Sequence, residues 1–168
     1  MEKSINLYSL TLKDYKSYMF TALFVVGNIL LPQLCHLVPN GGLILLPIYF
    51  FTLIAAYKYG WRVGLMCAIA SPLVNHALFG MPAIAVLPII LIKSTLLVAA
   101  ASIIANRTQK VTLALLTLVV LAYQIIGTAI EWAMVKDFYV AIQDFRIGVP
   151  GMAIQIIGGY LLLKGMKR

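Results

Sequence analysis

Acidic residues, charged residues of any kind and cysteines are all scarce in this sequence. Only five of its 168 residues are Asp or Glu, and charged residues make up 11% of the chain. A soluble domain of this length would need more polar side chains to cover its surface. Cys35 and Cys67 each stand alone in an apolar segment without C-x-x-C spacing, so neither indicates a redox or metal site.

Apolar sequence takes the place of the missing polar residues, with 62% hydrophobic residues and a mean hydropathy of +0.99. Several apolar runs approach the ~20 residues that a helix needs to cross a bilayer core of about 30 Å. We therefore predict an all-α integral membrane protein, a single membrane domain over residues 1–168 with a bundle of six transmembrane helices. The predicted spans, after an N-terminal segment 1–16, are 17–36, 43–57, 62–79, 83–105, 111–134 and 147–165. Pro47 indicates that the short second span is tilted or partly broken.

The net charge of +8 is unevenly distributed along the chain. If the six spans alternate, one side of the membrane receives Lys3, Lys13, Lys16, Lys58, Arg62, Arg107, Lys110, Lys164, Lys167 and Arg168. The other side receives Lys136 and Arg146. This asymmetry follows the positive-inside rule and predicts cytoplasmic N and C termini in a multi-pass protein of the plasma (inner) membrane of a prokaryote. The basic residues form no cluster on a soluble face, so nucleic acid is not an expected partner.

Lys93 is the one basic residue predicted deep inside a span. It lies ten residues into the fourth span, about 15 Å from the outer end and close to the bilayer midplane. A charged group at this depth is costly unless it is hydrated or paired, which makes it a functional-site hypothesis. Two interpretations stay open: Lys93 pairs with Glu131 of the fifth span, or it binds an anionic group of a substrate.

Other polar residues gather in the outer halves of the spans, while the inner halves have few. Gln124, Thr128 and Glu131, for example, follow one stripe of the fifth span. A channel would need polar groups through its full depth, so a binding pocket open to the outside fits better. The predicted substrate-binding residues are Lys93, His36, Asn40, Asn75, His76, Gln124, Glu131 and Gln155.

Two outer turns and two pairs of small residues complete the predicted functional features. The turns read VPNGG and FGMP, and their glycines and prolines predict a lid or rim formed by Pro39, Gly41, Gly42, Gly80, Met81 and Pro82. The small residues allow close helix approach, within the chain or to a partner. We assign them to a partner interface, which comprises Gly64, Ala68, Ala101 and Ala105.

Three segments carry a resemblance to a known family: LPQLCHLVPNGGLILLPIYF, YGWRVGLMCAIASPLVNHALFGMP and GVPGMAIQIIGGYLL. Over residues 17–165 the chain resembles the substrate-binding S component of energy-coupling factor (ECF) transporters. The resemblance implies a subunit that captures a vitamin or related small molecule from outside the cell. It also implies as partners a transmembrane coupling subunit, dedicated or shared, and two cytoplasmic ATPases. The chain has no G-x-x-x-x-G-K-[ST] motif, so it is not expected to be an enzyme itself, and ATP hydrolysis would come from those partners.

The sequence departs from the family in two places. Many members have an Ala-xxx-Ala pair in the first helix, whereas here Ala22 is followed four residues later by Val26. Nickel and cobalt members begin Met-His, whereas this chain begins Met-Glu, and we expect neither a metal site nor a cofactor. The cargo stays open among pantothenate, biotin-like, folate-like and pyrimidine-type compounds.

Two other functions compete with this interpretation. The first is a membrane scaffold similar in size and hydropathy to the cell-shape protein MreD, which would bind no small molecule and would use its inner side as an interface. The second is a small intramembrane enzyme. The sequence contains no H-E-x-x-H, no G-x-S-x-G and no paired aspartates that would support such an enzyme, and no catalytic residue is assigned.

Overall fold

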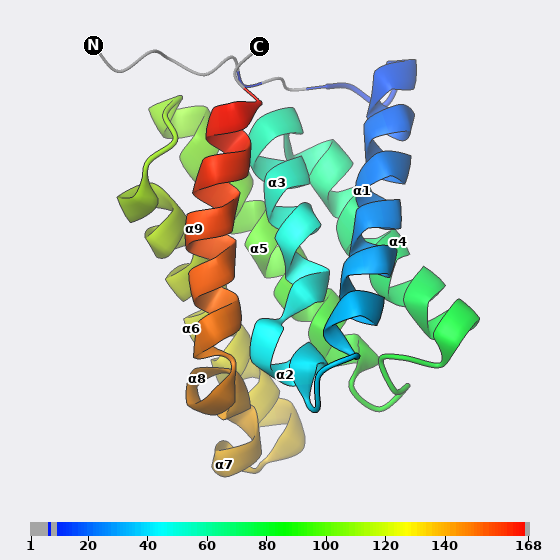
Figure 1. Cartoon of the computed structure of the whole chain (residues 1–168). Coiled ribbons are helices and arrows are strands. Elements are labelled where there is room, and N and C mark those ends of the chain that lie inside the picture. Colours follow the sequence, from blue (N-terminus) through cyan, green and yellow to red (C-terminus); the bar gives the residue numbers. More distant parts are fainter. Residues whose placement is uncertain (1–6, 8–9, 167–168) are drawn as a thin grey trace.

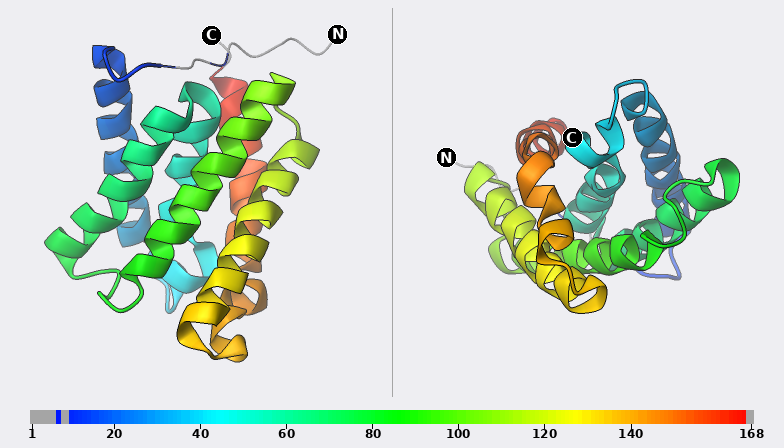
Figure 2. Two further views of the ribbon diagram at one scale, coloured as in Figure 1. Left: turned by 180° about the vertical axis from the view of Figure 1, so that it is seen from behind. Right: turned by 90° about the horizontal axis from the view of Figure 1, so that it is seen from below.

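The computed structural model describes residues 7 and 10–166, and every regular element in these residues is helical. Its elements are α1 (Tyr15–Cys35), α2 (Gly41–Leu45), the 3-10 helix η1 (Pro47–Tyr49), α3 (Phe50–Tyr59), α4 (Trp61–Phe79), α5 (Leu87–Thr108), α6 (Leu113–Val135), α7 (Phe138–Ala141), α8 (Gln143–Ile147) and α9 (Val149–Gly165). The six longer helices run side by side as a bundle (Figure 1). Seen along the bundle, α1 and α4 lie on one side and α6 and α9 on the other (Figure 2).

The two ends of the bundle differ in structure and in charge. The short helices α2, α7 and α8 gather at one end, which we call the capped end (Figure 1). At the opposite end α1 begins and α9 finishes. This second end, which we call the basic end, carries Lys13, Lys16, Lys58, Arg62, Arg107, Lys110 and Lys164. Lys136 and Arg146 lie at the capped end, while Lys3, Lys167 and Arg168 fall outside the described residues.

Four helices of the described chain are long and apolar enough to cross a membrane: α1, α4, α5 and α6, with 19 to 23 residues each. Helix α9 is apolar but has 17 residues. The predicted second span is broken, as Pro47 indicated, because Leu46 adopts a left-handed conformation with φ of 47° between α2 and η1. The fourth span was predicted from residue 83, but α5 begins at Leu87 because the preceding segment forms a loop.

The core of the bundle surrounds α3. Its residues Leu53, Ile54 and Ala55 are completely buried, and the helix packs against α1, α4, α5 and α9. A helix that is apolar around its whole circumference is stable only when neighbours cover every face, and this arrangement supplies them. Although α3 has only ten residues, its central position brings it into contact with four of the other long helices.

Apolar side chains also cover much of the outside of the bundle. Leu23, Leu30 and Leu34 on α1, Ile125 on α6 and Leu161 on α9 are each more than half exposed. Several polar side chains, in contrast, are completely buried: Ser17, Asn28, Thr52, Ser71, Gln124 and Gln155. Polar groups inside and apolar groups outside form the pattern expected of a protein whose solvent is lipid.

The four small residues assigned to a partner interface lie inside the bundle instead. Ala68 and Ala101 are completely buried, Ala105 is almost so, and Gly64 packs against α3. A Cβ at Gly64 would lie 2.6 Å from the Cβ of Ala56, so the glycine permits a close α3–α4 contact. These residues pack within the chain and do not form an exposed partner surface, because small-xxx-small spacing does not distinguish internal from external contacts.

Candidate functional site

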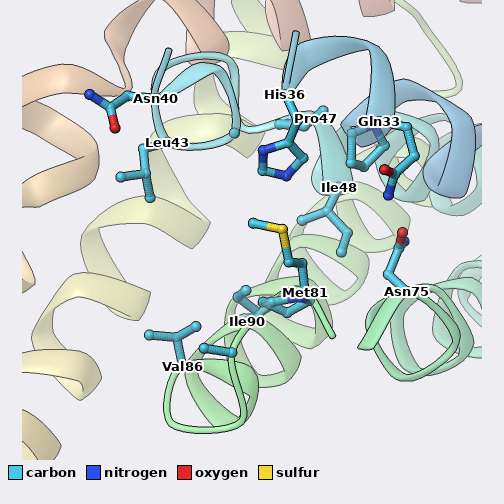
Figure 3. Close-up of a pocket in the computed structure, with 14 residues that line it drawn as sticks. Gln33, His36, Asn40, Leu43, Pro47, Ile48, Asn75, Met81, Val86 and Ile90 are labelled. Carbon is cyan, nitrogen blue, oxygen red and sulfur yellow. The ribbon is translucent and has the colours of Figure 1, made fainter. Parts of the chain in front are cut away.

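A cavity of about 390 Å³ opens at the capped end, between α1, α2, η1, α4, α5 and the loop of residues 80–86 (Figure 3). Most of its wall is apolar and includes Leu43, Ile48, Val86 and Ile90. Its polar lining comes from Gln33, His36, Asn40 and Asn75. Small-molecule sites commonly have this composition, in which a few polar groups orient the ligand within an apolar wall.

Asn75 on α4 holds its buried amide in a fixed orientation in the wall of the cavity. Its Nδ2 atom donates to the carbonyl oxygen of Asn28 at 2.9 Å and to that of Ser71 at 3.1 Å. Both donor positions of the amide are therefore occupied. The side chain is 2% exposed, and its Oδ1 atom has no partner within the protein. The unpartnered atom of the Asn75 amide is thus an acceptor, and it is buried in the cavity wall.

Asn28 on α1 supports Asn75 from below through a buried polar network. Its Nδ2 atom donates to Thr52 Oγ1 at 2.9 Å and to Ser71 Oγ at 3.1 Å, while its Oδ1 atom accepts from the backbone N–H of Phe51 at 3.2 Å. The network joins α1, α3 and α4. Sequence reasoning missed Asn28, although a lone asparagine within an apolar span is itself a signal of a buried polar role.

The turn between α1 and α2 forms one part of the cavity rim. A Cβ at Gly41 would lie 1.9 Å from the carbonyl oxygen of Cys35, so only glycine fits there. A Cβ at Gly42 would lie 2.9 Å from Cε1 of His36, so this glycine lets the imidazole lie against α2 (Figure 3). Gly42 lines the cavity, whereas Pro39 and Gly41 shape the turn beside it.

The loop between α4 and α5 forms the opposite part of the rim. Gly80 ends α4 with φ of 67°, a conformation that suits glycine. Met81 and Pro82 then line the cavity. His76, predicted to bind substrate, instead contacts this loop: its Nδ1 atom lies 2.8 Å from the carbonyl oxygen of Pro82. It is not among the cavity-lining residues and acts as a support for the rim.

Lys93 occupies a separate cluster, one turn along α5 from Ile90 of the cavity wall. Its Nζ atom lies 2.6 Å from Glu131 Oε2 and 2.8 Å from Asp144 Oδ2. Lys93 therefore pairs with Glu131 in this structure. It is not an unpaired lysine that is free to bind an anion. We call Lys93, Glu131 and Asp144 the Lys93 cluster; it joins α5, α6 and α8.

Asp144 was absent from the predicted site because it lies in the connection between the predicted spans 111–134 and 147–165 and was not expected beside them. Instead α7 and α8 fold back over the bundle, which brings Asp144 to a residue 51 positions earlier in the chain. Gly127 makes room for the cluster, since a Cβ there would lie 2.7 Å from Cγ of Lys93. The lysine stem can thus lie directly against α6.

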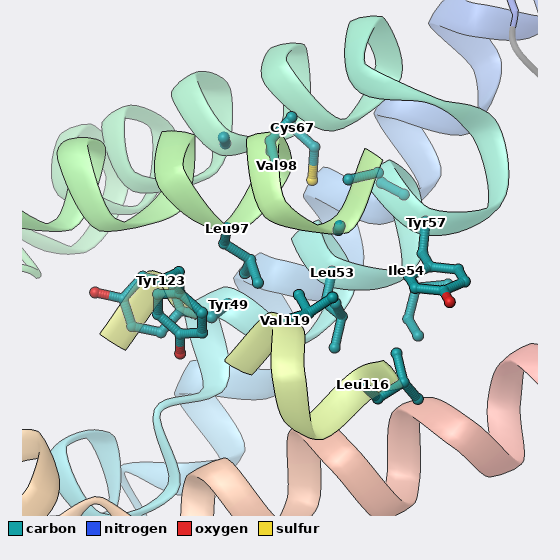
Figure 4. Close-up of a cluster of buried hydrophobic side chains, with 14 of the residues drawn as sticks. Tyr49, Leu53, Ile54, Tyr57, Cys67, Leu97, Val98, Leu116, Val119 and Tyr123 are labelled. Carbon is teal, nitrogen blue, oxygen red and sulfur yellow. The ribbon is translucent and has the colours of Figure 1, made fainter. Parts of the chain in front are cut away.

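A buried chain of hydrogen bonds joins α6, which also carries Glu131 of the cluster, to α9. Gln124 Nε2 donates to the hydroxyl oxygen of Tyr123 at 3.1 Å, and that hydroxyl donates to Gln155 Oε1 at 2.8 Å. Tyr49 packs on Tyr123 with ring centroids 5.5 Å apart (Figure 4). Gln124 Oε1, Gln155 Nε2 and the hydroxyl of Thr128 have no hydrogen-bond partner within the protein.

The predicted substrate-binding residues thus divide into two neighbouring groups. His36, Asn40 and Asn75 line the cavity. Lys93, Glu131, Gln124 and Gln155 belong to the cluster and its hydrogen-bonded chain on α5, α6 and α9. In the part of the chain that the structure describes, no group of three or more His, Cys, Asp or Glu side chains is placed to hold a metal ion.

Comparison with known proteins finds no family model, no curated protein and no solved structure that matches this chain.

Proposed function

We propose that this protein is a membrane-embedded binding subunit that captures a small molecule in the cavity at its capped end. The observation that carries this proposal is the cavity itself. Its volume of about 390 Å³ lies within the range of small-molecule sites, and its wall is apolar with a few polar groups. The unpartnered Oδ1 of Asn75 adds a buried polar atom that a ligand could satisfy.

The proposed membrane orientation places the capped end outside and the basic end in the cytoplasm. Six spans would then be formed by α1, the broken segment α2–η1–α3, α4, α5, α6 and α9. The seven basic residues of the basic end support this orientation through the positive-inside rule. In a prokaryotic plasma membrane the cavity would face the external medium, which is where an importer meets its cargo.

The resemblance to S components of ECF transporters suggests how the captured molecule would be delivered. In this proposal a transmembrane coupling subunit and two cytoplasmic ATPases bind the loaded protein and drive release. The chain itself contains no phosphate-binding loop, which agrees with a division of labour between capture and ATP hydrolysis. A membrane scaffold of the MreD type would have no need of a cavity of this kind.

A thermal-shift screen in detergent tests the proposal. The purified protein is heated with each member of a panel of vitamins and their precursors, and its Tm is compared with that of the free protein. A ligand that binds only the folded state raises Tm in proportion to the logarithm of its concentration. We expect at least one compound to give such a shift, whereas no shift across the panel would favour the scaffold.

A further inference from the structure

The wall of the cavity carries no acidic or strongly basic side chain. None of the described residues that line it is Asp, Glu, Lys or Arg. Lys93, Glu131 and Asp144 pair with one another and are not among these lining residues. The imidazole of His36 is the one ionisable group in the described wall. A charged ligand in the cavity would therefore find no carboxylate, ammonium or guanidinium group to balance its charge.

The polar part of the wall consists of three amides and an imidazole, which belong to Gln33, Asn40, Asn75 and His36. The imidazole lies among the apolar lining side chains (Figure 3). The side chains of Gln33, Asn40 and His36 make no hydrogen bond to any other described residue. An amide has a donor and an acceptor side by side, so a neutral carboxamide or lactam can pair with both. A carboxylate only accepts and an ammonium group only donates, so each would use one half of the amide.

The remainder of the wall is apolar, and its described residues include no Phe, Tyr or Trp. Leu43, Pro47, Ile48 and Met81 are typical of it. A charged group that leaves water for such a wall loses its hydration and gains no counter-charge, whereas a neutral polar group loses much less. The volume of about 390 Å³ lies near the lower end of the range for small-molecule sites, which favours a compact ligand.

We infer that the cavity selects an uncharged small molecule, with a largely apolar body and a neutral hydrogen-bonding group such as a carboxamide, a lactam or a hydroxyl. This inference rests on the proposed function and names its substrate class. It replaces the expectation from sequence, in which Lys93 binds an anionic group of the substrate. Lys93 instead joins α5 to α6 and α8 through its two carboxylate partners.

Matched neutral and ionic compounds test the inference by thermal shift at neutral pH. Nicotinamide and nicotinate, panthenol and pantothenate, and biotinamide and biotin each pair a neutral compound with a carboxylate. Tryptophol is the neutral member of a fourth set, with the carboxylate indole-3-acetate and the amine tryptamine. In any set that binds, we expect the neutral compound to raise Tm most and to bind roughly tenfold or more tightly than the ion. An ion that matches or exceeds its neutral counterpart would overturn the inference.

A charge introduced into the wall tests the same point from the side of the protein. Val86 lines the cavity and is 48% exposed, so there is room for a lysine at this position. In Val86→Lys we expect the affinity for the carboxylate to rise roughly tenfold or more relative to that for its neutral counterpart, measured by calorimetry. Ile84→Lys is the matched control, because Ile84 lies in the same loop, is 74% exposed and does not line the cavity. An affinity ratio that is unchanged in Val86→Lys, or changed equally in both variants, would contradict the inference.

The outcomes separate this inference from the proposed function. Shifts that are largest for the ions would contradict the selection of an uncharged ligand and leave the binding function intact. A compound elsewhere in the vitamin panel that raises Tm counts by its own charge at neutral pH: a neutral compound supports the inference and an ion contradicts it. Absence of any shift, both with the matched compounds and with the vitamin panel, would contradict the proposed function and remove the basis of the inference.

Discussion

Lys93 on α5 and Asp144 on α8 are 51 residues apart in the sequence, yet their Nζ and Oδ2 atoms lie 2.8 Å apart. The contact connects the short helices of the capped end to the long helices of the bundle. Glu131 completes the cluster from α6 at 2.6 Å. The Lys93 cluster thus joins the capping segment, through α8, to the long helices α5 and α6.

Removal of the Asp144 side chain should loosen this capping segment. In Asp144→Ala we expect faster amide hydrogen exchange over residues 138–147 and a lower Tm. The loss in stability should be smaller than the roughly 3–5 kcal/mol for complete loss of a buried ion-pair partner, because Lys93 keeps Glu131. Asn106→Ala, at an exposed position of α5 near the basic end, serves as the control. Unchanged exchange in Asp144→Ala would show that the ion pair does not hold α8.

Replacement of Lys93 should be more damaging, because it leaves two carboxylates without their shared counter-charge. We expect Lys93→Met to lower the free energy of unfolding by about 3–5 kcal/mol, measured by denaturation in mixed micelles. The triple variant Lys93→Met, Glu131→Gln, Asp144→Asn should recover much of this loss. Equal instability of the single and triple variants would mean that packing of the lysine stem, and not its charge, dominates.

Asn28 should contribute to stability through the groups it satisfies. Asn28→Ala removes the acceptor of the Phe51 backbone N–H and the donor to the hydroxyl oxygens of Thr52 and Ser71, which keep their contacts to Ile48 and Cys67. A loss of about 1–3 kcal/mol is expected for each buried group that stays unsatisfied. Asn106→Ala on the exposed face of α5 should be nearly neutral in the same unfolding measurement. Similar stabilities of the two variants would contradict the role of the network.

The α3–α4 contact should tolerate no side chain at position 64. Gly64→Ala would place a Cβ 2.6 Å from that of Ala56, in a region where both helices are fully packed. We expect a loss of about 1–3 kcal/mol from overpacking. Gly165→Ala is the matched control, since a Cβ there meets nothing within 4 Å. A Gly64→Ala protein as stable as Gly165→Ala would show that the helices separate easily.

Hydrophobic patterning alone predicted much of the helical framework. Pro47 indicated the break in the predicted second span, and Met81 and Pro82, which line the cavity, stand in the turn for which a rim was predicted. These features are local, since they depend on residue type within a few positions. His36 and Asn75, which line the cavity, were selected because polar residues are rare in apolar helices, and Asn40 because it stands beside the glycines of the outer turn.

Features that depend on how the helices turn toward one another could not be obtained in this way. Asp144 joins the Lys93 cluster only because α7 and α8 fold back over the bundle. The sequence around Asp144 contains no motif that predicts this turn of the chain. His76 turns toward Pro82 and not into the cavity. Gly64 and Ala68 were assigned to a partner surface because their spacing is the same whether the neighbouring helix belongs to this chain or to another.

The measurement that tests the central claim most directly is ligand binding after the cavity has been filled. Ala83 lines the cavity and Ala85, in the same loop, does not; both are exposed, so a large side chain can be placed at either position. Binding of the compound that stabilises the wild-type protein best is measured by calorimetry for Ala83→Trp and Ala85→Trp. We predict that Ala83→Trp loses binding and that Ala85→Trp retains it. Equal affinity of the two variants would show that the ligand binds elsewhere and would contradict the account.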